Sequence, residues 1–368
     1  MTKNKENSGK LGVLIIGCGE VSTQHIAAFQ ENPHTAIRAL CGRARESCDK
    51  RAADANLKDV GIYTDYEEAL KHPGVDIVSV CTPHHLHCEH VLAAAEAGKH
   101  IVIEKPAGNS LEELREMRQA VEKAGVKTIV SFVLRWNPLF ETLKRLIADD
   151  AFGRVYYAET DYQHYLSTVW GSWKYGCRKD LGVSAFLVAG CHAVDALRWF
   201  AAPGIHEAAR AVEVFAMSGG YRKGRTDELD AATGKMRRGV PPMEYDGLEV
   251  ALVRFENGAI GKVSVNFDCI RPYGFPIEIF GDKGSVKDNK IWSHKFYGQT
   301  DWIEIPTICP DSGAVTHHPF QAQMDHFIDC ILNDRESHCN LADAYHTHEI
   351  VFAIEECYKT GAPVRLPL

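Results

Sequence analysis

The sequence predicts two domains: a doubly wound α/β domain in residues 1–134 and an α+β domain with a large, mostly antiparallel sheet in residues 135–368. Three observations support this division. The chain of 368 residues is long for a single hydrophobic core. Its first third alternates short apolar runs with amphipathic stretches, which is typical of a parallel sheet covered by helices. The remainder carries longer runs of mixed alternation, which favour antiparallel strands.

Five short apolar runs in the first domain are the candidate strands of the parallel sheet. They are apolar at nearly every position, as strands buried on both faces are. Gly98 and Gly125 each end a helical pattern directly before the next strand, and glycine is common at helix C-termini. The candidate strands cover residues 12–17, 36–42, 76–82, 100–105 and 127–133. The helical patterns between them cover residues 22–32, 65–72, 87–100 and 110–125.

The second domain is marked by strand-like runs joined by turns. Asn257-Gly258 separates two alternating runs, and Asn-Gly in that position is a strong hairpin signal. Helical patterns near 185–200 and 319–334 are expected to cover one face of the sheet. The alternative for the C-terminal helix is that it packs back on the first domain. Residues 219–243 are polar and rich in glycine and predict a long loop. The strand-like runs cover residues 154–165, 208–219, 247–267 and 275–294.

The composition argues against several classes of protein. The net charge of -8 argues against nucleic acid as a partner, because nucleic-acid-binding domains carry a basic face. The first ten residues are polar, and no stretch approaches the roughly 18 apolar residues of a membrane span. The twelve cysteines form no CxxC pair, and several lie in apolar runs, as reduced thiols do in the cytoplasm. We therefore expect a cytoplasmic protein with no membrane or nucleic-acid partner.

A glycine-rich turn directly follows the first apolar run and precedes a helical pattern. Gly17, Gly19 and Ser22 have the GxGxx(G/A) spacing of a dinucleotide-binding turn, with serine in place of the third glycine. The first glycine permits a tight turn, the second lets the backbone approach a pyrophosphate, and the helix N-terminus binds the phosphates. This context indicates NAD(P) binding. The loop residues expected to contact the cofactor are Gly17, Cys18, Gly19, Glu20 and Val21.

The end of the second apolar run bears on the choice between NAD and NADP. An Asp or Glu there would bind the ribose hydroxyls, but Gly42 occupies the position, and Arg43 and Arg45 lie beside it. An arginine without a competing carboxylate suits the 2′-phosphate of NADP. The cofactor prediction is therefore NAD(P), with NADP preferred and with contacts from Gly42 and Arg43. The alternative is that both arginines only face solvent.

Four segments carry a resemblance to a known family: GCGEVSTQHIAAF, VSVCTPHHLHCEHVLAAAEAGKHIVIEKPAGNSLEE, RWNP and GCHAVDALRWF. They resemble the glucose–fructose oxidoreductase/inositol dehydrogenase/rhizopine catabolism (Gfo/Idh/MocA) family, most continuously over residues 11 to 150. The resemblance implies an N-terminal Rossmann domain and a C-terminal domain with an open sheet. It also implies NAD(P)-linked oxidation or reduction of sugars, cyclitols or their derivatives. Homo-oligomers (dimers, tetramers or larger) built through the C-terminal sheet are the implied assembly.

The strand-like run at 100–105 ends with two charges, Glu104 and Lys105, and Pro106 restricts the backbone behind them. Core strands rarely end in this way. The resemblance implies that Lys105 lies beside the nicotinamide, where a cation stabilises the alkoxide that develops during hydride transfer. Lys105 is therefore a candidate catalytic and cofactor-contacting residue, and Glu104 is expected to orient the cofactor or the loop.

Residues 84–90, HHLHCEH, contain four histidines and a cysteine within seven residues, which suggests a metal site. However, the histidines span a loop-to-helix turn and no set of carboxylate partners is evident, so we expect no metal. The resemblance assigns this stretch to the nicotinamide-side loop. It therefore implies cofactor contacts from Thr82, His84 and His87.

The second constellation is GCHAVDALRWF, in which His192 and Asp195 are three residues apart and share one helical face. A histidine in such an apolar pattern is usually a core residue, but the resemblance implies that His192 accepts the proton of the substrate hydroxyl, a role that imidazole suits. The family often has an aspartate four residues earlier, where this chain has Val188. Another group must then complete the site. The candidate substrate-binding residues are Arg135, Tyr162, His164, Lys174 and Asp195.

The leading functional prediction is an NAD(P)-dependent dehydrogenase that acts on a secondary alcohol of a sugar, cyclitol or glycoside. The segment SAFLVAGCHAVDALRWF resembles members that act at the C3 hydroxyl of hexoses. Two alternatives stay open at this point. One is an aldehyde or ketone reductase similar to dihydrodiol dehydrogenases, and the other is a cofactor-binding regulatory protein without turnover. The presence of both Lys105 and His192 argues against the second alternative.

Overall fold

The computed structural model describes residues 9–168, 173–182, 184–230, 233–312 and 315–368, which form two compact units. The polar start of the chain, residues 1–8, lies outside the described residues. The first unit comprises Met1–Gly108, Glu112–Ser131 and Pro319–Leu341. The second unit comprises Asn109–Leu111, Phe132–His318 and Ala342–Leu368.

The first unit contains a six-stranded parallel sheet with the order β3-β2-β1-β4-β5-β6. Its central strands are apolar because both faces are covered: every residue of β4 is buried, as are five of the six residues of β1. The parallel sheet predicted for this region is confirmed. Strand β3 was not anticipated from the sequence. The strands are β1 (Leu11–Ile16), β2 (Thr35–Cys41), β3 (Gly61–Tyr63), β4 (Ile77–Val80), β5 (His100–Ile103) and β6 (Thr128–Val130).

Helices connect and cover this sheet. The segment expected to cover the second sheet, residues 319–334, instead forms α10 in the first unit, where it packs against α1. Asn32 at the end of α1 donates a 2.7 Å hydrogen bond to Asp325 on α10, so polar as well as apolar contacts hold α10 there. The helices are α1 (Ser22–Glu31), α2 (Arg45–Asp54), α3 (Tyr66–Leu70), α4 (His87–Glu96), α5 (Leu111–Ala124) and α10 (Phe320–Leu332), with the 3-10 helix η1 (His84–Leu86) before α4.

The second unit contains a nine-stranded sheet with the order β16-β15-β14-β13-β7-β12-β11-β8-β17. Only the β7–β12 pair is parallel among these strands, so the predicted antiparallel character is confirmed. The Asn257-Gly258 turn joins β11 to β12, and Gly258 has the positive φ of +85° that such a turn requires. The strands are β7 (Val155–Gln163), β8 (Ala211–Gly219), β11 (Leu248–Phe255), β12 (Ile260–Asn266), β13 (Ile277–Gly281), β14 (Gly284–Lys287), β15 (Lys290–Ser293), β16 (Ile303–Glu304) and β17 (Val364–Arg365).

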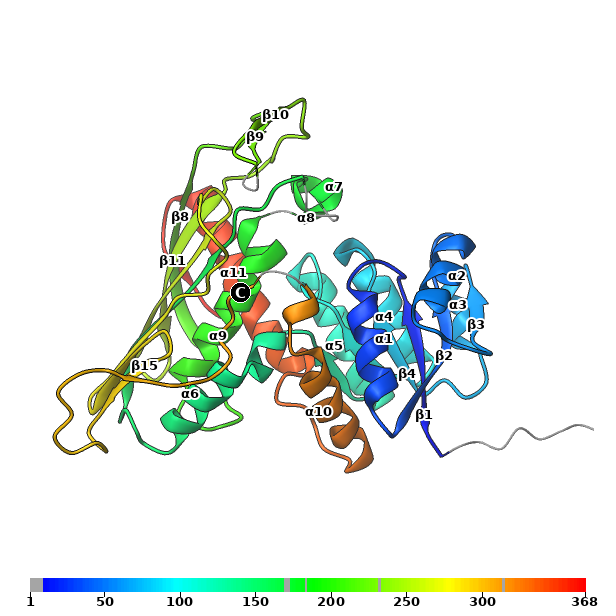
Figure 1. Cartoon of the computed structure of the whole chain (residues 1–368), viewed down its shortest axis with the longest axis horizontal. Coiled ribbons are helices and arrows are strands. Elements are labelled where there is room, and N and C mark those ends of the chain that lie inside the picture. The colour runs from blue at the N-terminus through cyan, green and yellow to red at the C-terminus, as the bar shows by residue number, and fades with distance from the viewer. Residues whose placement is uncertain (1–8, 169–172, 183, 231–232, 313–314) are drawn as a thin grey trace, which may run out of the picture. The chain divides into compact units, whose positions relative to one another are not determined.

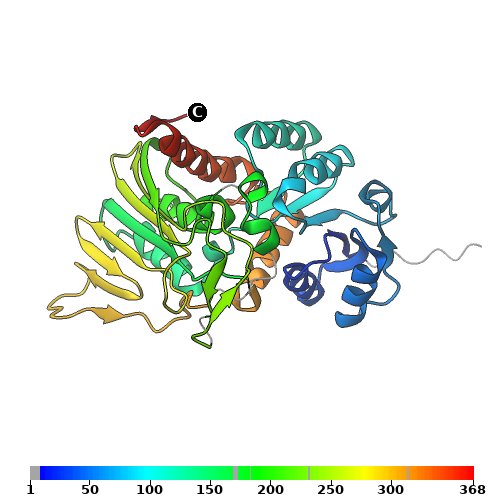
Figure 2. The same cartoon turned by 90° about the horizontal axis from the view of Figure 1, so that it is seen from above.

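Helices α9 and α11 lie on the same side of this sheet (Figure 1). Thr160 on β7 donates a 2.8 Å hydrogen bond to the carbonyl of Ala193 on α9, and Cys357 on α11 contacts the carbonyl of Val214 on β8. Figure 2 shows the C-terminal segment at the β8 edge of the sheet, where β17 pairs. The helices of this unit are η2 (Val133–Trp136), α6 (Pro138–Ala148), α7 (Trp173–Gly176), α8 (Lys179–Gly182), the π-helix η3 (Phe186–Gly190), α9 (Cys191–Ala201), η4 (Val315–His317) and α11 (Leu341–Thr360).

The long polar segment at residues 219–243 is not purely a loop. It contains a short antiparallel pair, β9 (Asp227–Leu229) and β10 (Met236–Arg238), visible at the top of Figure 1. Buried Arg222 anchors the segment by donating hydrogen bonds to the carbonyls of Leu166 and Phe267.

Among the described residues, no helix is both long enough and apolar enough to cross a membrane.

Candidate active site

The dinucleotide-binding turn has the geometry that a pyrophosphate requires. Gly17 has φ +97°, and a Cβ there would lie 2.6 Å from the backbone of Cys81, so only glycine fits. At Gly19 a Cβ would meet nothing within 4 Å, which leaves open space beside the loop. Ser22 is buried and its hydroxyl donates a 2.6 Å hydrogen bond to the carbonyl of Gly19. The first turn of α1 has no acidic residue, so this turn fits the phosphates of NAD(P).

Cys18 and Gly42 both lie beside Cys48 of α2. The Cys18 thiol lies 3.5 Å from the Cys48 sulfur, so its side chain points toward α2. A Cβ on Gly42 would lie 2.8 Å from the same Cys48 sulfur. Arg43 is exposed directly after Gly42. The remaining loop residues, Glu20 and Val21, are exposed and half-buried respectively.

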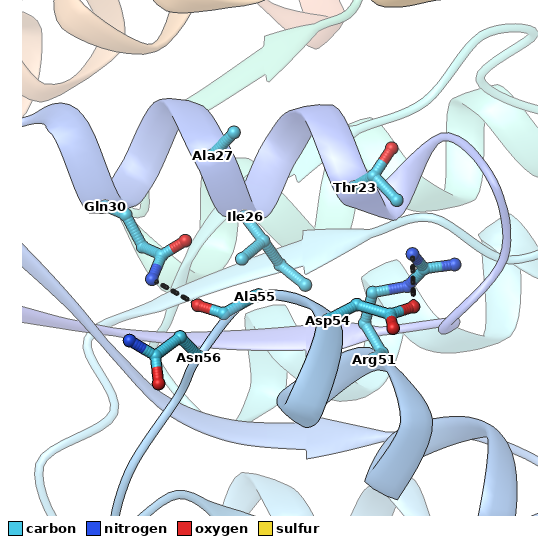
Figure 3. Close-up of a pocket in the computed structure, with 8 residues that line it drawn as sticks. All are labelled: Thr23, Ile26, Ala27, Gln30, Arg51, Asp54, Ala55 and Asn56. Carbon is cyan, nitrogen blue, oxygen red and sulfur yellow. Dashed lines mark hydrogen bonds and ion pairs between the residues drawn. The ribbon is translucent and has the colours of Figure 1, made fainter.

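A pocket of about 330 Å³ lies between α1 and α2 (Figure 3). Gln30 on α1 bridges it by donating a 2.9 Å hydrogen bond to the carbonyl of Ala55. Arg51 also lines the pocket and donates to the carbonyl of Gly19, so it supports the dinucleotide-binding turn from behind. No residue predicted to contact the cofactor lines this pocket among the described residues, so we assign it no part in cofactor binding.

Glu104 and Lys105 lie at the carboxyl end of β5, the edge at which doubly wound sheets bind ligands. Lys105 is half-buried. Glu104 is buried, and one of its oxygens lies 2.9 Å from Nε2 of His25 on α1 while the other accepts the Lys105 backbone N–H at 3.3 Å. Burial opposes charge in His25, but the neighbouring Cys81 and Glu104 outweigh it and raise the pKa of His25 to about 10.

The histidines after β4 have unequal surroundings. His84 is half-buried in η1, next to His85. His87 is fully buried, and its two ring nitrogens lie 2.8 Å from the carbonyl oxygens of Pro106 and Thr82. Both ring nitrogens of His87 are therefore engaged by backbone carbonyls, and the ring connects these two turns. The Thr82 hydroxyl pairs with His90 at 3.1 Å, and burial lowers the pKa of His90 to about 4.

In the second unit, His192 lies in the first turn of α9 and is 5% exposed. Its ring packs edge-on against Phe132, with 6.0 Å between the ring centroids. Val188 is buried in the π-helical turn that leads into α9. It occupies the position at which the resemblance places an aspartate. At the start of this turn, Glu249 accepts the N–H groups of Ala185 and Phe186.

Arg135 and Asp195, both predicted to contact the substrate, form a buried ion pair with each other. Two Arg135 nitrogens donate to the two Asp195 oxygens at 2.7 and 2.6 Å, and Arg135 also donates to Asp343 at 2.5 Å. Both side chains are about 1% exposed. Arg135 and Arg198 together hold the pKa of Asp343 well below its usual range, although burial opposes this. The network therefore holds Asp195, which lies on α9 three residues after His192.

Tyr162 and His164 lie together near the end of β7. The Tyr162 hydroxyl is 3.2 Å from Nδ1 of His164, and the ring of Tyr273 packs against both. Burial raises the pKa of Tyr162 and lowers that of His164, which keeps both groups neutral at pH 7. Lys174 is exposed on α7, with its ammonium 4.9 Å from the ring centre of Tyr175. Across the described residues, no three His, Cys, Asp or Glu side chains are grouped to hold a metal ion.

Comparison with protein families matches both halves of the chain. Residues 11–132 match an oxidoreductase family with an NAD-binding Rossmann fold, and residues 140–287 match the Gfo/Idh/MocA C-terminal domain. A levoglucosan dehydrogenase of Pseudarthrobacter phenanthrenivorans is 30% identical over 292 residues, 76% of this chain and 73% of that protein. The chain belongs to the Gfo/Idh/MocA family.

Further relatives of this Gfo/Idh/MocA member agree with the assignment. A scyllo-inositol 2-dehydrogenase (NAD(+)) of Bacillus subtilis is 25% identical over 334 residues, 86% of each chain. A crystal structure of an oxidoreductase domain protein from Kribbella flavida is 25% identical, covers 98% of this chain and 100% of its own, and has a TM-score of 0.82. The protein is an NAD(P)-dependent oxidoreductase with the two-domain architecture of the family.

For this Gfo/Idh/MocA protein, the sequence predicted that Glu104 and Lys105 belong to the site. It did not predict that Glu104 pairs with buried His25, or that His25 also contacts Ser79. His25 was visible as a polar residue on the buried face of a helix that follows a dinucleotide-binding turn. Its partner Glu104 is 79 residues away in the chain, so no local pattern could connect the two. Lys105 belongs to the first unit and His192 to the second.

Proposed function

We propose that the protein oxidises a secondary alcohol of a sugar, cyclitol or glycoside, with Lys105 and His192 as its catalytic residues. The observation that carries the proposal is the placement of Lys105 at the carboxyl end of β5, one residue after a buried, paired carboxylate. The relatives named as levoglucosan and scyllo-inositol dehydrogenases supply the substrate class. Oxidation at the C3 hydroxyl of a hexose is the more specific version of this proposal.

The residues of the chain divide the chemistry between them. NAD(P), when bound, takes up the hydride from the carbinol carbon. The ammonium of Lys105 stabilises the negative charge that develops on the substrate oxygen as the hydride leaves. The imidazole of His192 accepts the hydroxyl proton, since a neutral ring can take a proton at pH 7. Tyr162, His164 and Lys174 are the proposed contacts for the remaining hydroxyls.

We further propose a preference for NADP over NAD. Gly42 stands where an acid would bind the ribose, and the Cys48 sulfur fills the space that a side chain there would need. Arg43 is exposed beside this position and suits a 2′-phosphate.

A substrate screen tests the proposed function. Purified protein is mixed with NAD or NADP and with sugars, cyclitols and glycosides, including levoglucosan and scyllo-inositol, and the reduced-nicotinamide absorbance is followed. We expect reduction with at least one compound, and product analysis then identifies the oxidised carbon. Turnover only with aldehydes or ketones plus reduced cofactor would contradict the proposal and favour a dihydrodiol-dehydrogenase-like reductase.

The pH dependence of the oxidation tests the role of His192. The rate should rise with pH as this imidazole loses its proton, and His192→Ala should abolish that limb while cofactor still binds. Val188→Asp should move the limb to higher pH, because an adjacent anion favours imidazolium. A limb that stays in place in both variants would assign the proton to another group, such as Tyr162 or Lys105.

We propose a homo-oligomer built through the outer face of the large sheet. Alternate residues of β11 are buried, whereas the opposite face of the sheet exposes large apolar side chains on β8, β11, β12 and β15. These exposed side chains are Phe215, Met217, Leu252, Ile260 and Trp292. Leu252→Glu together with Met217→Glu should reduce the mass measured by light scattering to that of a monomer. A monomeric parent protein would contradict the proposal.

We propose a cytoplasmic location on the basis of the thiols. All twelve cysteines, each within the described part of the chain, are free thiols, which is typical of a reducing compartment. Fractionation of the source cells with an antibody to the protein tests this location.

A further inference from the structure

Two stretches of the second unit that are distant in the chain contact each other. One is the long polar segment, residues 219–230 and 233–245 (the excursion). The other, residues 164–168 and 173–179 (the substrate segment), carries His164 and Lys174, two of the proposed substrate contacts. Strands β9 and β10 of the excursion and helix α7 of the substrate segment all lie at the top of Figure 1. The proposed function gives the excursion no role, although it lies against residues that have one.

A buried carboxylate of the excursion binds the substrate segment at Thr168. The two oxygens of Glu228 on β9 accept the Thr168 backbone N–H at 3.3 and 3.2 Å, and one of them also accepts the Thr168 hydroxyl. Two cations, Arg222 and Arg237, lie 3.4 and 3.9 Å from the same carboxylate. A buried carboxylate is costly unless it is paired, so these cations stabilise Glu228 in this place. Thr168 is therefore held through both its backbone and its side chain.

Arg222 carries the same network to both parts of the substrate segment. Its guanidinium donates a 2.6 Å hydrogen bond to the carbonyl of Leu166. It also lies over two rings, 4.4 Å from the ring centre of Tyr165 and 5.7 Å from that of Trp173, where a cation is attracted by the aromatic face. The pair of Arg222 and Glu228 thus contacts the substrate segment at four residues.

The excursion also holds the backbone on both sides of Lys174. Before it, the indole N–H of buried Trp173 donates to the carbonyl of Pro241 at 3.2 Å. After it, the hydroxyl of buried Tyr245 donates to the carbonyl of Gly176. Lys174 itself is exposed. The place of its backbone is therefore set by neighbours that the excursion binds.

We propose that Glu228 is a positioning residue whose buried carboxylate fixes Thr168 and thereby the segment that presents Lys174 to the substrate hydroxyls. The proposal rests on the function proposed above, in which Lys174 contacts the substrate. A segment that is already held loses less conformational freedom when a ligand binds, so the excursion strengthens substrate binding rather than the hydride step. The expected signature is a change in KM with little change in kcat.

Steady-state kinetics of matched variants test this role. Glu228→Gln should raise the KM of the carbohydrate by about tenfold, with kcat within about threefold and the dissociation constant of the cofactor within about twofold. Thr168→Val removes only the hydroxyl and should raise KM by about threefold, whereas Thr168→Ser should behave as the parent protein does. Arg225→Gln is the control, because it removes an exposed pair with Asp227 on the same excursion and should leave KM unchanged. An unchanged KM in Glu228→Gln would overturn the proposal.

Coupling between the two positions separates positioning from a general loss of stability. If Glu228 acts through Thr168, the double variant of Glu228→Gln and Thr168→Val should raise KM by less than the product of the two single effects. Effects that multiply would show that Glu228 acts independently of Thr168 and would overturn the proposed route. Thr168→Val keeps the pair of Glu228 and Arg222, so it tests the proposal even if Glu228→Gln does not fold.

Hydrogen–deuterium exchange of the full-length protein tests the anchoring without any substrate. The reporter amides are those of Cys177 and Lys179, which bond to the Trp173 carbonyl at 2.9 Å and the Glu244 carboxylate at 2.8 Å. In both single variants the peptide covering residues 173–179 should exchange several-fold faster than in the parent protein or the control variant. Equal exchange in all of these proteins would contradict the positioning role. Faster exchange in a protein that turns over no carbohydrate would support the anchoring and contradict only the proposed function.

Discussion

Two buried glutamates, one in each unit, have opposite charge states. Glu104 at the end of β5 is 6% exposed and Glu249 on β11 is 2% exposed, so burial hardly distinguishes them. Burial raises the pKa of Glu249 to about 8, even though two backbone N–H groups bind its oxygens, and the nearby carboxylate of Glu355 adds to the effect. Burial opposes charge in Glu104 as well, but His25 and Lys105 lower its pKa.

The difference shows that a cationic neighbour, rather than depth in the protein, decides whether a buried carboxylate carries charge. In the second unit a neutral acid supports the start of the π-helical turn before α9. In the first unit a charged acid stands next to a lysine at the ligand-binding edge of the sheet. Charge is thus maintained where we propose that chemistry occurs.

Removal of the lysine beside Glu104 should have the largest effect. Lys105→Ala should lower turnover by at least about a hundredfold while the fold and cofactor binding are kept, because one positioned cation is lost. Steady-state kinetics and cofactor titration measure this. Lys71→Ala, which removes an exposed lysine paired with Glu68, is the control and should turn over normally. Near-normal turnover in folded Lys105→Ala would exclude Lys105 from the mechanism.

Neutral replacement of the two glutamates tests the comparison itself. Glu104→Gln should lower the free energy of unfolding by about 2 kcal/mol at neutral pH, because His25 loses its anion in a buried place. Glu249→Gln should lower it by only about 1 kcal/mol: the native side chain is already neutral, but the amide nitrogen replaces one of the two oxygens that accept the N–H groups of Ala185 and Phe186. Urea unfolding of both variants measures the difference. Equal losses in the two variants would mean that burial alone governs both sites.

The free energy of unfolding should depend on pH over a different pH range for each of the two regions. Between 6.5 and about 10, folded His25 keeps a proton that the unfolded chain has lost, so the free energy of unfolding falls as pH rises. Between 4.5 and about 8, folded Glu249 keeps its proton while the unfolded residue is ionised, so stability again falls with rising pH.

Urea unfolding across this pH range measures both contributions. His25→Gln should flatten the curve in the alkaline window and Glu249→Gln in the acidic one. If His25→Gln leaves the alkaline slope intact, His25 is not the group that holds the proton there.

A new carboxylate at the cofactor end of the first unit extends the comparison and should have the smallest effect. Gly42→Asp should weaken NADPH binding relative to NADH by about tenfold, because the anion repels a 2′-phosphate and binds ribose hydroxyls. Since a Cβ at this position meets the Cys48 sulfur at 2.8 Å, the variant is best made together with Cys48→Ala, with Cys48→Ala alone as control. Fluorescence titration gives both affinities. A parent protein that already favours NADH would contradict the NADP preference.

Much of the fold follows from local patterns. Runs that are apolar at nearly every position predicted the parallel sheet, and the Asn257-Gly258 turn predicted the β11–β12 hairpin, because side-chain periodicity and turn chemistry are local properties. The exceptions are short or remote elements. Strand β3 has only three residues, and the apolar face of α10 could not show that its partner is α1.

The sequence by itself determined the dinucleotide-binding turn, the position of Lys105 at a strand end and the family of the protein, since each depends on residues that are neighbours in the chain. Only the tertiary structure decided the partners of the buried charges. His25 and Glu104 are 79 residues apart, and Arg135 and Asp195 are 60 apart. The charge of a buried group depends on the atoms that surround it, and folding brings those atoms from distant parts of the chain.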